Sequence, residues 1–153
     1  MTMNDISTST GTTAGTGSGA TLEERGAEAA VLAVIDGVFA AWADNDADAA
    51  VASYAPDATA LLPGTYLEGR EAVRTAMAAA FAGPLKGAHV IHDVLSVRFS
   101  GTGTALVVNR AGLVLAGETE PRGENRALDS WVLSEKDGAW QIRAFHNVPE
   151  NAG

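Results

Sequence analysis

Four long stretches in the second half of the chain alternate apolar and polar residues with a period of two and are rich in β-branched residues. They span about 87–99, 104–116, 125–135 and 139–148. A period of two places every second side chain on the same face, which is typical of β-strands with one buried face. Glycine-containing and polar segments separate the stretches, so consecutive hairpins are the shortest connections. The sequence therefore predicts a four-stranded antiparallel meander.

Three segments in the first half of the chain carry apolar residues at helical spacing. They run from Thr21 to about Trp42, from Asp46 to about Tyr54, and from Gly69 to the stop signal Gly83-Pro84. Glu24 follows Thr21 at the spacing of a capping box, which marks the start of the first helix. Residues 58–62 and 66–67 read as short extended pieces. We predict an α+β domain with three N-terminal helices packed on a curved, mainly four-stranded antiparallel sheet that has one or two short extra strands.

A chain of 153 residues has the length of a single domain, and its 46% of hydrophobic residues suffices for a buried core. We expect this domain to span residues 21–150. Residues 1–20 consist mostly of Ser, Thr and Gly, which do not repay the entropy of ordering, so they are predicted to form a disordered tail. Residues 151–153 are expected to form a short C-terminal tail.

The charge and the missing residue types narrow the classes of partner. A net charge of −9, with only 10 Lys and Arg and no basic run, disfavours nucleic acid and anionic membranes. The chain has no cysteine, so disulfides, thiolate nucleophiles and Cys-based zinc sites are excluded, and its three histidines lack the spacing of metal ligands. The start of the chain does not resemble a signal peptide, and no apolar run approaches the ~20 residues of a membrane span. We predict a cytoplasmic protein with no metal and no membrane association.

A series of short motifs resembles one superfamily. The motifs are Ala40-Ala41-Trp42-Ala43-Asp44-Asn45-Asp46, Tyr54-Ala55-Pro56-Asp57-Ala58, Gly69-Arg70-Glu71-Ala72-Val73, Asp137-Gly138-Ala139-Trp140-Gln141-Ile142 and His146-Asn147. In this order they resemble the nuclear transport factor 2-like (SnoaL-like, ketosteroid isomerase-like) superfamily, which has a cone-shaped fold. The ending Ala144-Phe145-His146-Asn147 most resembles the SgcJ/EcaC group, found in enediyne and other actinomycete secondary metabolism. The resemblance implies a homodimer and a pocket between the helices and the concave sheet, but no particular reaction.

His146 is the first candidate for a catalytic group. By alternation it shares a strand face with Trp140, Ile142 and Ala144, the face expected to line the core. An imidazole in such a pocket would act as a general base or acid near neutral pH, or bind a carbonyl oxygen. The alternative is a histidine exposed at the strand end or satisfied by a backbone group.

The partner of His146 depends on the turn at Asp137-Gly138. A two-residue type I′ turn pairs Asp129 with His146, and Asp129 would then orient the imidazole or serve as a base itself. A three-residue loop with a glycine bulge would pair Leu128 with His146, place Ser130 on that face, and turn Asp129 outward as an ordinary charge. A hairpin across residues 100–103 would in the same way place Asp93 opposite Arg110.

Large side chains are expected to bound an apolar cavity for a flat or extended hydrophobic ligand. The candidates for binding are Phe39, Trp42, Tyr54, Tyr66, Met77, Phe81, Ser130, Trp131 and Asn147. Among them Tyr54, Tyr66, Trp131 and Asn147 add hydrogen-bonding groups. The sequence contains no phosphate loop, dinucleotide fingerprint or nucleophile elbow, so no cofactor is predicted.

Two hypotheses follow. The leading one is a small-molecule-pocket protein of polyketide or enediyne antibiotic biosynthesis. It would bind a hydrophobic polyketide or polyene intermediate and, if catalytic, transform it by cofactor-free acid/base chemistry of the cyclase, isomerase or dehydratase type, through His146 and Asp129. The alternative is a non-catalytic accessory protein, namely a carrier or chaperone for a labile intermediate or a partner of a polyketide synthase.

Overall fold

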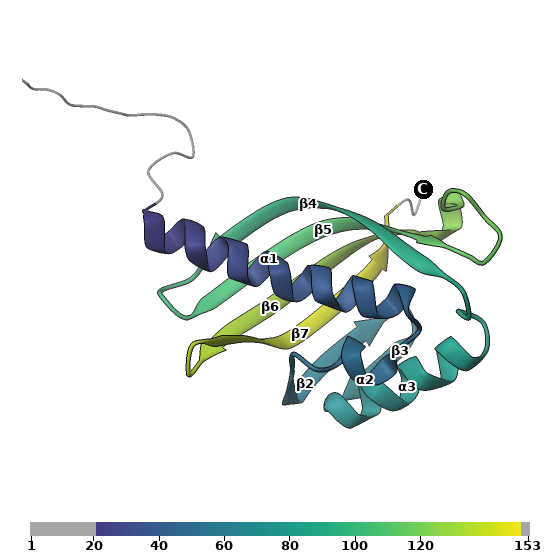
Figure 1. Ribbon diagram of the computed structural model, residues 1–153, viewed down its shortest axis with the longest axis horizontal. Coiled ribbons are helices and arrows are strands. Elements are labelled where there is room, and N and C mark those ends of the chain that lie inside the picture. Colours follow the sequence, from purple (N-terminus) through teal and green to yellow (C-terminus); the bar gives the residue numbers. More distant parts are fainter. Residues whose placement is uncertain (1–20, 151–153) are drawn as a thin grey trace, which may run out of the picture. The chain divides into compact units, whose positions relative to one another are not determined.

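The computed structural model describes residues 21–150 (Figure 1), which divide into two units at residue 30, namely 21–30 and 31–150. The described part of the first unit is the start of helix α1 (Leu22–Ala43). The backbone N–H of Thr21 donates to Oε1 of Glu24 at 2.8 Å, and that of Glu24 donates to Oγ1 of Thr21 at 3.0 Å. This reciprocal pair confirms the predicted capping box. The two predicted tails, 1–20 and 151–153, lie outside the described residues.

Helix α1 is more apolar than expected. It has 22 residues, and one 18-residue window reaches a mean hydropathy of 1.5, so its length and composition would allow it to cross a membrane. The expectation that no apolar run approaches that length is therefore not met. A helix that packs in a protein core meets the same criteria, and α1 has five buried residues within the second unit: Val31, Ile35, Val38, Phe39 and Ala41. This feature alone does not identify a membrane span, and the cytoplasmic location stays a prediction.

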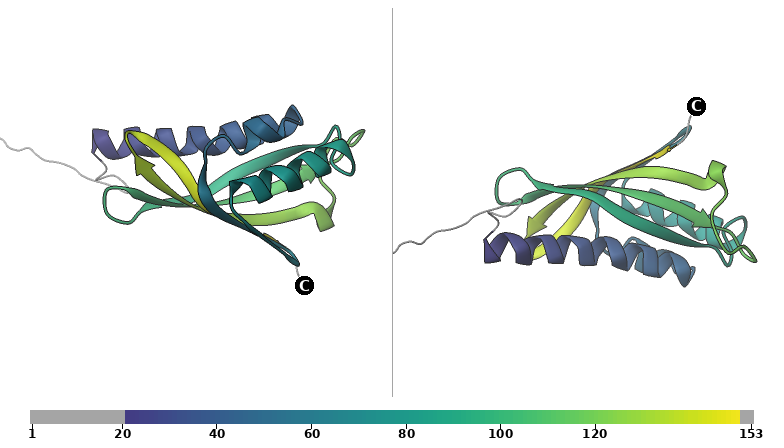
Figure 2. Two further views of the ribbon diagram at one scale, coloured as in Figure 1. Left: turned by 90° about the horizontal axis from the view of Figure 1, so that it is seen from below. Right: turned by 90° about the horizontal axis from the view of Figure 1, so that it is seen from above.

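The second unit is built on one six-stranded sheet with the order β3-β2-β7-β6-β5-β4. Its strands are β2 (Tyr54–Leu62), β3 (Thr65–Glu68), β4 (His89–Phe99), β5 (Thr104–Val114), β6 (Arg126–Lys136) and β7 (Ala139–Pro149). The last four pair as consecutive antiparallel hairpins, which confirms the predicted meander. The sheet is mixed, not purely antiparallel, because β2 joins it parallel to β7. Seen edge-on, the strands are strongly twisted relative to one another (Figure 2).

Strand β2 is longer than predicted, at the expense of the second helix. Helix α2 contains only Ala47–Ala50, and Tyr54 is the first residue of β2. The backbone N–H of Ile142 donates to the carbonyl of Ser53 at 2.8 Å, and Tyr54 pairs with Ile142. Pro56 is accommodated because the ladder between β2 and β7 is interrupted between Tyr54 and Thr59. Pairing with β7 thus overrides the weak local helical pattern.

Helix α3 (Arg70–Ala82) packs on β2 and is anchored at its first turn. Gly69 has a φ of 93°, a conformation that glycine adopts without strain, and its N–H donates to the carbonyl of Ala58 at 2.7 Å. Nη1 of Arg70 donates to the carbonyl of Tyr54 at 3.3 Å. The Gly-Arg segment of the third motif therefore fixes α3 against the beginning of β2.

Two further contacts hold the loops at the end of the sheet where β4 begins and β5 ends. Asn45 has a φ of 53°, and its Oδ1 accepts a hydrogen bond of 2.9 Å from the N–H of Gly87, which ties the end of α1 to the turn before β4. The loop between β5 and β6 contains the short 3-10 helix η2 (Gly123–Asn125). This loop packs onto β5, because Pro121 lies so close to Gly112 that an added Cβ would meet its Cγ at 2.5 Å.

Candidate active site

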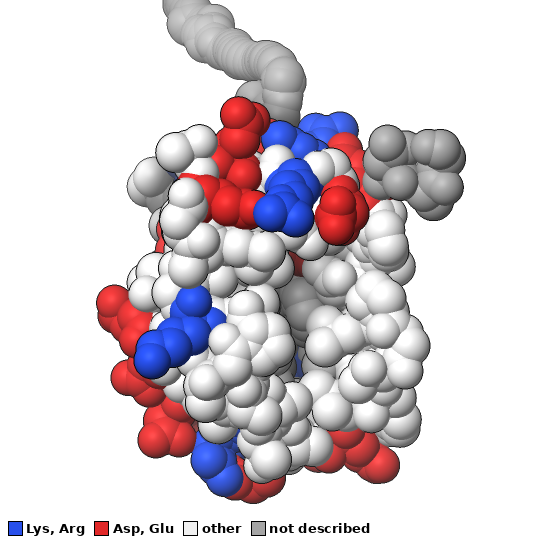
Figure 3. Space-filling view, turned by 90° about the vertical axis from the view of Figure 1, so that its right-hand side faces the viewer, with Lys and Arg blue, Asp and Glu red and all other residues white. Residues whose placement is uncertain are grey.

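The second unit encloses a cavity of about 370 Å³ between the helices and the inner face of the sheet. Most of its walls are apolar side chains from α1, α3 and strands β2, β5, β6 and β7, including Val38, Leu62, Val73, Leu113, Ala127 and Phe145. Glu124, Asn125 and Arg126, from η2 and the start of β6, also line it. Figure 3 shows a hollow framed mainly by uncharged side chains, with charged side chains gathered above it. The predicted apolar pocket is present.

One buried carboxylate lines this cavity. Asp129, on β6, lines the cavity although its exposed fraction is only 2%. Its Oδ1 accepts a hydrogen bond of 2.7 Å from Nδ2 of Asn147 on β7, and its Oδ2 accepts one of 3.1 Å from Nδ2 of Asn109 on β5. Two amide groups from the neighbouring strands therefore hold the carboxylate from both sides.

The surroundings of Asp129 act on its ionisation in opposite directions. Burial raises the pKa of the carboxyl, while the hydrogen bonds from Asn147 and Asn109 and the nearby charge of His92 lower it, and burial dominates. A carboxyl with a raised pKa is a stronger base than an exposed aspartate once it is ionised. The site thus combines a buried base with apolar walls.

Tyr54 adds a donor to the same cavity. Its side chain lines the cavity, and its hydroxyl group makes no hydrogen bond to any other residue of 21–150. Burial and the negative charge of Asp129 both raise the pKa of the phenol, so it stays protonated. A buried O–H without a protein partner is available to a ligand oxygen.

Aromatic rings form the wall around Asp129. Trp131 packs edge-on against Phe39, with ring centroids 5.9 Å apart, and in a tilted arrangement against Phe145 at 4.4 Å. All three residues line the cavity. Rings of this kind bind flat or unsaturated ligands by stacking and edge contacts.

The register of the β6–β7 hairpin differs from both predicted alternatives. Asp137 and Gly138 have φ values of 52° and 81°, as in a two-residue type I′ turn, and Lys136 pairs with Ala139. A β-bulge then shifts the register, because Leu133 pairs with Ile142 but Val132 pairs with Ala144, which leaves Arg143 as the extra residue. Beyond this bulge, each β6 residue pairs with a β7 residue one position later than in a regular two-residue hairpin.

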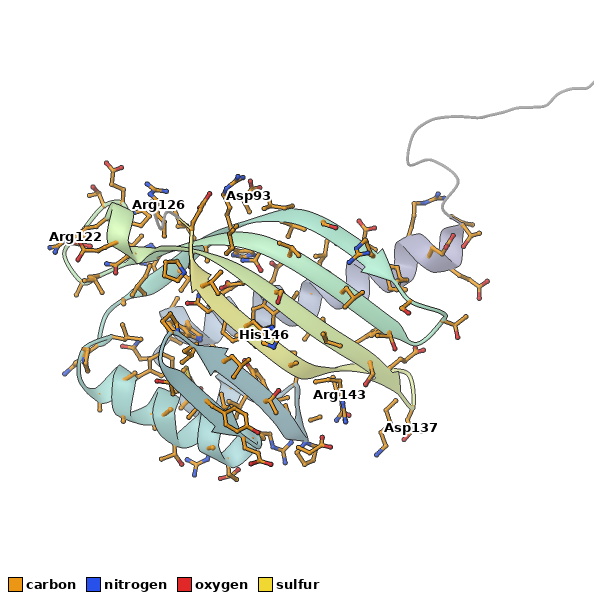
Figure 4. The ribbon with its side chains drawn as sticks, turned by 180° about the vertical axis from the view of Figure 1, so that it is seen from behind. Asp93, Arg122, Arg126, Asp137, Arg143 and His146 are labelled. Atoms are coloured by element: carbon orange, nitrogen blue, oxygen red, sulfur yellow. The ribbon has the colours of Figure 1, made fainter. Side chains whose placement is uncertain are left out.

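The bulge moves His146 out of the cavity. His146 pairs with Ser130, is exposed, and does not line the cavity, whereas the next residue, Asn147, pairs with Asp129 and points inward. The predicted placement of His146 on the inner face with Trp140 and Ile142 is therefore wrong, and the alternative of an exposed histidine holds. Neither of its two predicted partners, Asp129 or Leu128, pairs with it. Figure 4 shows His146 over the middle of the outer face, the face of the sheet opposite the cavity.

The binding candidates divide into two groups. Those that line the cavity are Phe39, Trp42, Tyr54, Met77, Trp131 and Asn147. Ser130 does not line it, because it alternates with Asp129 and Trp131 and lies on the outer face. Tyr66 lies outside it on β3 with 60% exposure, and Phe81 is buried instead in a core cluster with Ala41 and Ala50.

The sequence interpretation missed Asn109. This residue is completely buried and does not line the cavity. Its position carried a signal, because it interrupts an otherwise apolar series of alternating residues: Ala105, Val107, Ala111 and Leu113. A polar residue at a core position of a strand requires a partner, and here that partner is Asp129.

The titratable side chains of β4 and the side chain of Arg110 on β5 lie outside the cavity. Nε2 of His92 lies 2.9 Å from Oδ1 of Asp36 on α1, and its ring packs 4.5 Å from Phe39. Asp93 pairs with Arg110 in the ladder, as predicted, but the side chain of Arg110 forms its hydrogen bond with Glu150, at 2.6 Å. Within residues 21–150 no group of three or more His, Asp or Glu side chains is placed to hold a metal ion.

Comparisons with known proteins agree with this architecture. The chain is similar to a domain of unknown function with a cystatin-like fold from Nostoc punctiforme, with 26% identity over 82% of this chain and 78% of that chain and a TM-score of 0.77. It shares its fold with Aln2 from a Streptomyces species (21% identity, 82% and 91% covered, TM-score 0.68). It also shares its fold with a putative scytalone dehydratase from Novosphingobium aromaticivorans (12% identity, 86% and 96% covered, TM-score 0.67).

No curated protein matches the chain. The sequence model of the SnoaL-like domain, in contrast, matches residues 23–146, which include every residue of the cavity described above except Asn147 and Pro149. Together with the curved mixed sheet and the helices that precede it, this match shows that the chain belongs to the SnoaL-like domain family, on a cystatin-like, nuclear transport factor 2-like fold.

Proposed function

We propose that this protein binds a hydrophobic polyketide or polyene intermediate in its cavity and transfers a proton on it, with Asp129 as the general base. The observation that carries the proposal is the buried Asp129 carboxylate, which lies among apolar and aromatic walls and keeps two amide donors. Such an environment holds a carboxylate close to the ligand and away from water, which strengthens it as a base. The reaction would be of the cyclase, isomerase or dehydratase type and would need no cofactor.

Tyr54 would act on the same ligand. Removal of a proton next to a carbonyl group leaves negative charge on the carbonyl oxygen, and a buried hydroxyl donor stabilises that charge. The Tyr54 hydroxyl has no protein partner within the described residues and lies near enough to feel the charge of Asp129. In this proposal Asp129 takes the proton and Tyr54 donates a hydrogen bond to the oxygen.

A probe that needs only one proton abstraction tests this proposal without knowledge of the natural substrate. In 5-nitrobenzisoxazole a base removes the ring C–H proton, the N–O bond breaks, and a coloured cyanophenolate is released. We expect the purified protein to catalyse this elimination and Asp129→Asn to lose at least ~10²-fold of the rate, as is typical for a positioned base. Asp93→Asn, which changes an exposed carboxylate on β4, is the matched control. Equal rates for Asp129→Asn and the unmodified protein would rule out the role of Asp129.

A non-catalytic carrier or chaperone is the second candidate. The apolar lining and the small number of polar groups in the cavity favour it. Under this alternative the protein binds an apolar fluorescent probe with a dissociation constant that Asp129→Asn leaves nearly unchanged, and it does not turn over the benzisoxazole. Fluorescence titration and the elimination assay on the same two proteins distinguish the alternatives.

The narrower assignment to enediyne or polyketide biosynthesis rests on the closing Ala144-Phe145-His146-Asn147 motif and on the apolar cavity. Co-purification of the chain with a polyketide synthase, or a polyene found by mass spectrometry in organic extracts of the protein from its producing organism, would support it. A gene neighbourhood without any synthase gene would count against it.

We also propose that the chain forms a homodimer through the outer face of the sheet. Leu61 on β2 lies beside Tyr66 and His146 in the ladder, and Leu61, Tyr66 and Val148 are each more than 40% exposed. Light scattering should give twice the monomer mass for the full chain, and the monomer mass for the double variant Leu61→Asp/Val148→Asp. Leu22→Asp, at an exposed apolar residue of α1, is the control. A monomeric unmodified chain would refute this proposal.

A further inference from the structure

The amide of Asn109 has a fixed orientation. Nε1 of Trp131 donates to Oδ1 of Asn109 at 2.7 Å, and the indole nitrogen is a donor only. Nδ2 of Asn109 donates to the backbone carbonyl of Arg110 at 3.0 Å, and a carbonyl is an acceptor only. A rotation of the amide by 180° would break both contacts. Asn109 therefore presents N–H, and not oxygen, to Asp129.

The second amide at Asp129 lacks such anchors. Asn147 donates to Oδ1 of Asp129, but its own Oδ1 makes no hydrogen bond to any residue in the described chain, and Asn147 lines the cavity. Asn147 can turn and accept a hydrogen bond from a protonated carboxyl, whereas Asn109 cannot. The two oxygens of Asp129 are thus unequal, since Oδ2 is restricted to accepting and Oδ1 is free to carry a proton.

We propose that Asn109, held by Trp131, is a positioning residue that keeps Oδ2 of Asp129 as an acceptor and directs the transferred proton to Oδ1, beside Asn147. Asn109 is fully buried and does not line the cavity, so it acts through Asp129 and not on the ligand. This inference rests on the proposed role of Asp129 as the base. It predicts that the proton taken from the ligand resides on the oxygen that faces the adjustable amide.

The other ionisable groups near Asp129 or in its cavity belong to β2, β4, β6 and η2. His92 on β4 lowers the pKa of Asp129, and it is itself bound to Asp36 of α1. The phenol of Tyr54 on β2 feels the charge of Asp129, and Glu124 and Arg126 line the same cavity. None of these groups is hydrogen-bonded to Asp129, whereas Asn109 and Asn147 are. Loss of one amide donor is therefore expected to change the titration of Asp129 directly.

The experiment follows the side-chain carboxyl carbon of Asp129 by NMR over a pH titration of the full chain, with the signal assigned by Asp129→Asn. Asn109→Leu removes the donor at similar size, so the titration midpoint should rise, because the anion loses a hydrogen bond. Trp131→Phe should raise it less, because the carbonyl of Arg110 still holds the amide. Val107→Ala, at a buried residue two positions away on the same face of β5, should leave it unchanged. The pH–rate profile with 5-nitrobenzisoxazole should shift in the same order.

An unchanged midpoint in folded Asn109→Leu would overturn the inference, and so would an equal rise in Val107→Ala. If Asn109→Leu does not fold, Asn109→Ala is measured under the same criteria, because it also removes the amide donor to Asp129. The titration does not depend on turnover. A benzisoxazole rate that survives Asp129→Asn would therefore refute the proposed base, while the NMR midpoints still decide whether Asn109 controls the carboxyl.

Discussion

Ser130 lies directly opposite His146 in the ladder between β6 and β7, on the outer face of the sheet. The cavity is on the other face, so neither side chain reaches a ligand bound there. We predict that His146→Ala changes the rate of benzisoxazole elimination by less than about twofold, since substitutions away from packed or functional features have small effects. A loss comparable to that of Asp129→Asn would show that His146 takes part in the chemistry.

Ionisation of Asp129 should destabilise the folded protein. Its pKa is raised on folding, so the folded state binds this proton more tightly than the unfolded state. The stabilisation that comes from this tighter proton binding is fully present below the pKa of Asp129 in the unfolded state, which is about 3.9. It is lost as the pH rises through the pKa of Asp129 in the folded state. We expect this loss in the unmodified protein and in Asp93→Asn, and its absence in Asp129→Asn.

Urea unfolding at a series of pH values measures this effect. The difference in the free energy of unfolding between the unmodified protein and Asp129→Asn isolates one carboxyl from the others. If the free energies of unfolding of the unmodified protein and Asp129→Asn change in parallel from about pH 4 to 7, the raised pKa of Asp129 is contradicted.

The contact between Gly112 and Pro121 should not tolerate a side chain. A Cβ at residue 112 would lie 2.5 Å from Cγ of Pro121, in a place where the loop before η2 packs on β5. We predict that Gly112→Ala costs about 1–3 kcal/mol of stability, as for other overpacked sites. Gly103→Ala is the control, because nothing lies within 4 Å of its added Cβ. Equal unfolding midpoints for the two variants would show that the loop moves away freely.

The cavity should lose its ligand when its volume is filled. Ala111, on β5, lines it opposite the helices, and Ala111→Phe would place a ring inside. We expect a weaker affinity for an apolar fluorescent probe, by at least ~10-fold, since a clash within a packed site costs more than about 1.4 kcal/mol. Tyr66→Phe, at an exposed residue of β3, should bind as the unmodified protein does. Unaltered affinity in Ala111→Phe would place the ligand elsewhere.

Local patterns predicted most of the fold. The period-two stretches and their turns located β4 to β7 within about two residues, and Thr21, Gly69 and Gly83 marked the ends of helices that the structure contains. The parallel pairing of β2 with β7 was not predictable, because it joins residues far apart in the sequence and depends on the carbonyl of Ser53 meeting Ile142. Long-range pairing of this kind leaves no periodic signal in a short strand.

The site was predicted only in part. Four of the predicted site residues do line the cavity: Asp129, Tyr54, Trp131 and Asn147. They could be predicted because a large or polar side chain at an inward position of a strand indicates a site. The error at His146 came from counting alternation through Arg143, where the strand contains one extra residue. The ion pair of Arg143 with Asp57 of β2, at 3.2 Å, lies at this irregularity, but one sequence does not reveal it.

The bulge at Arg143 also has a consequence for aligning relatives. Trp140 and Asn147 both point inward although seven positions separate them, an odd spacing that a regular strand forbids. In a relative without the extra residue, the equivalent inward positions would be six apart. A gapless alignment of the two chains would then match Asn147 with an outward residue, so a one-residue gap at position 143 is needed before the pocket residues of the family are compared.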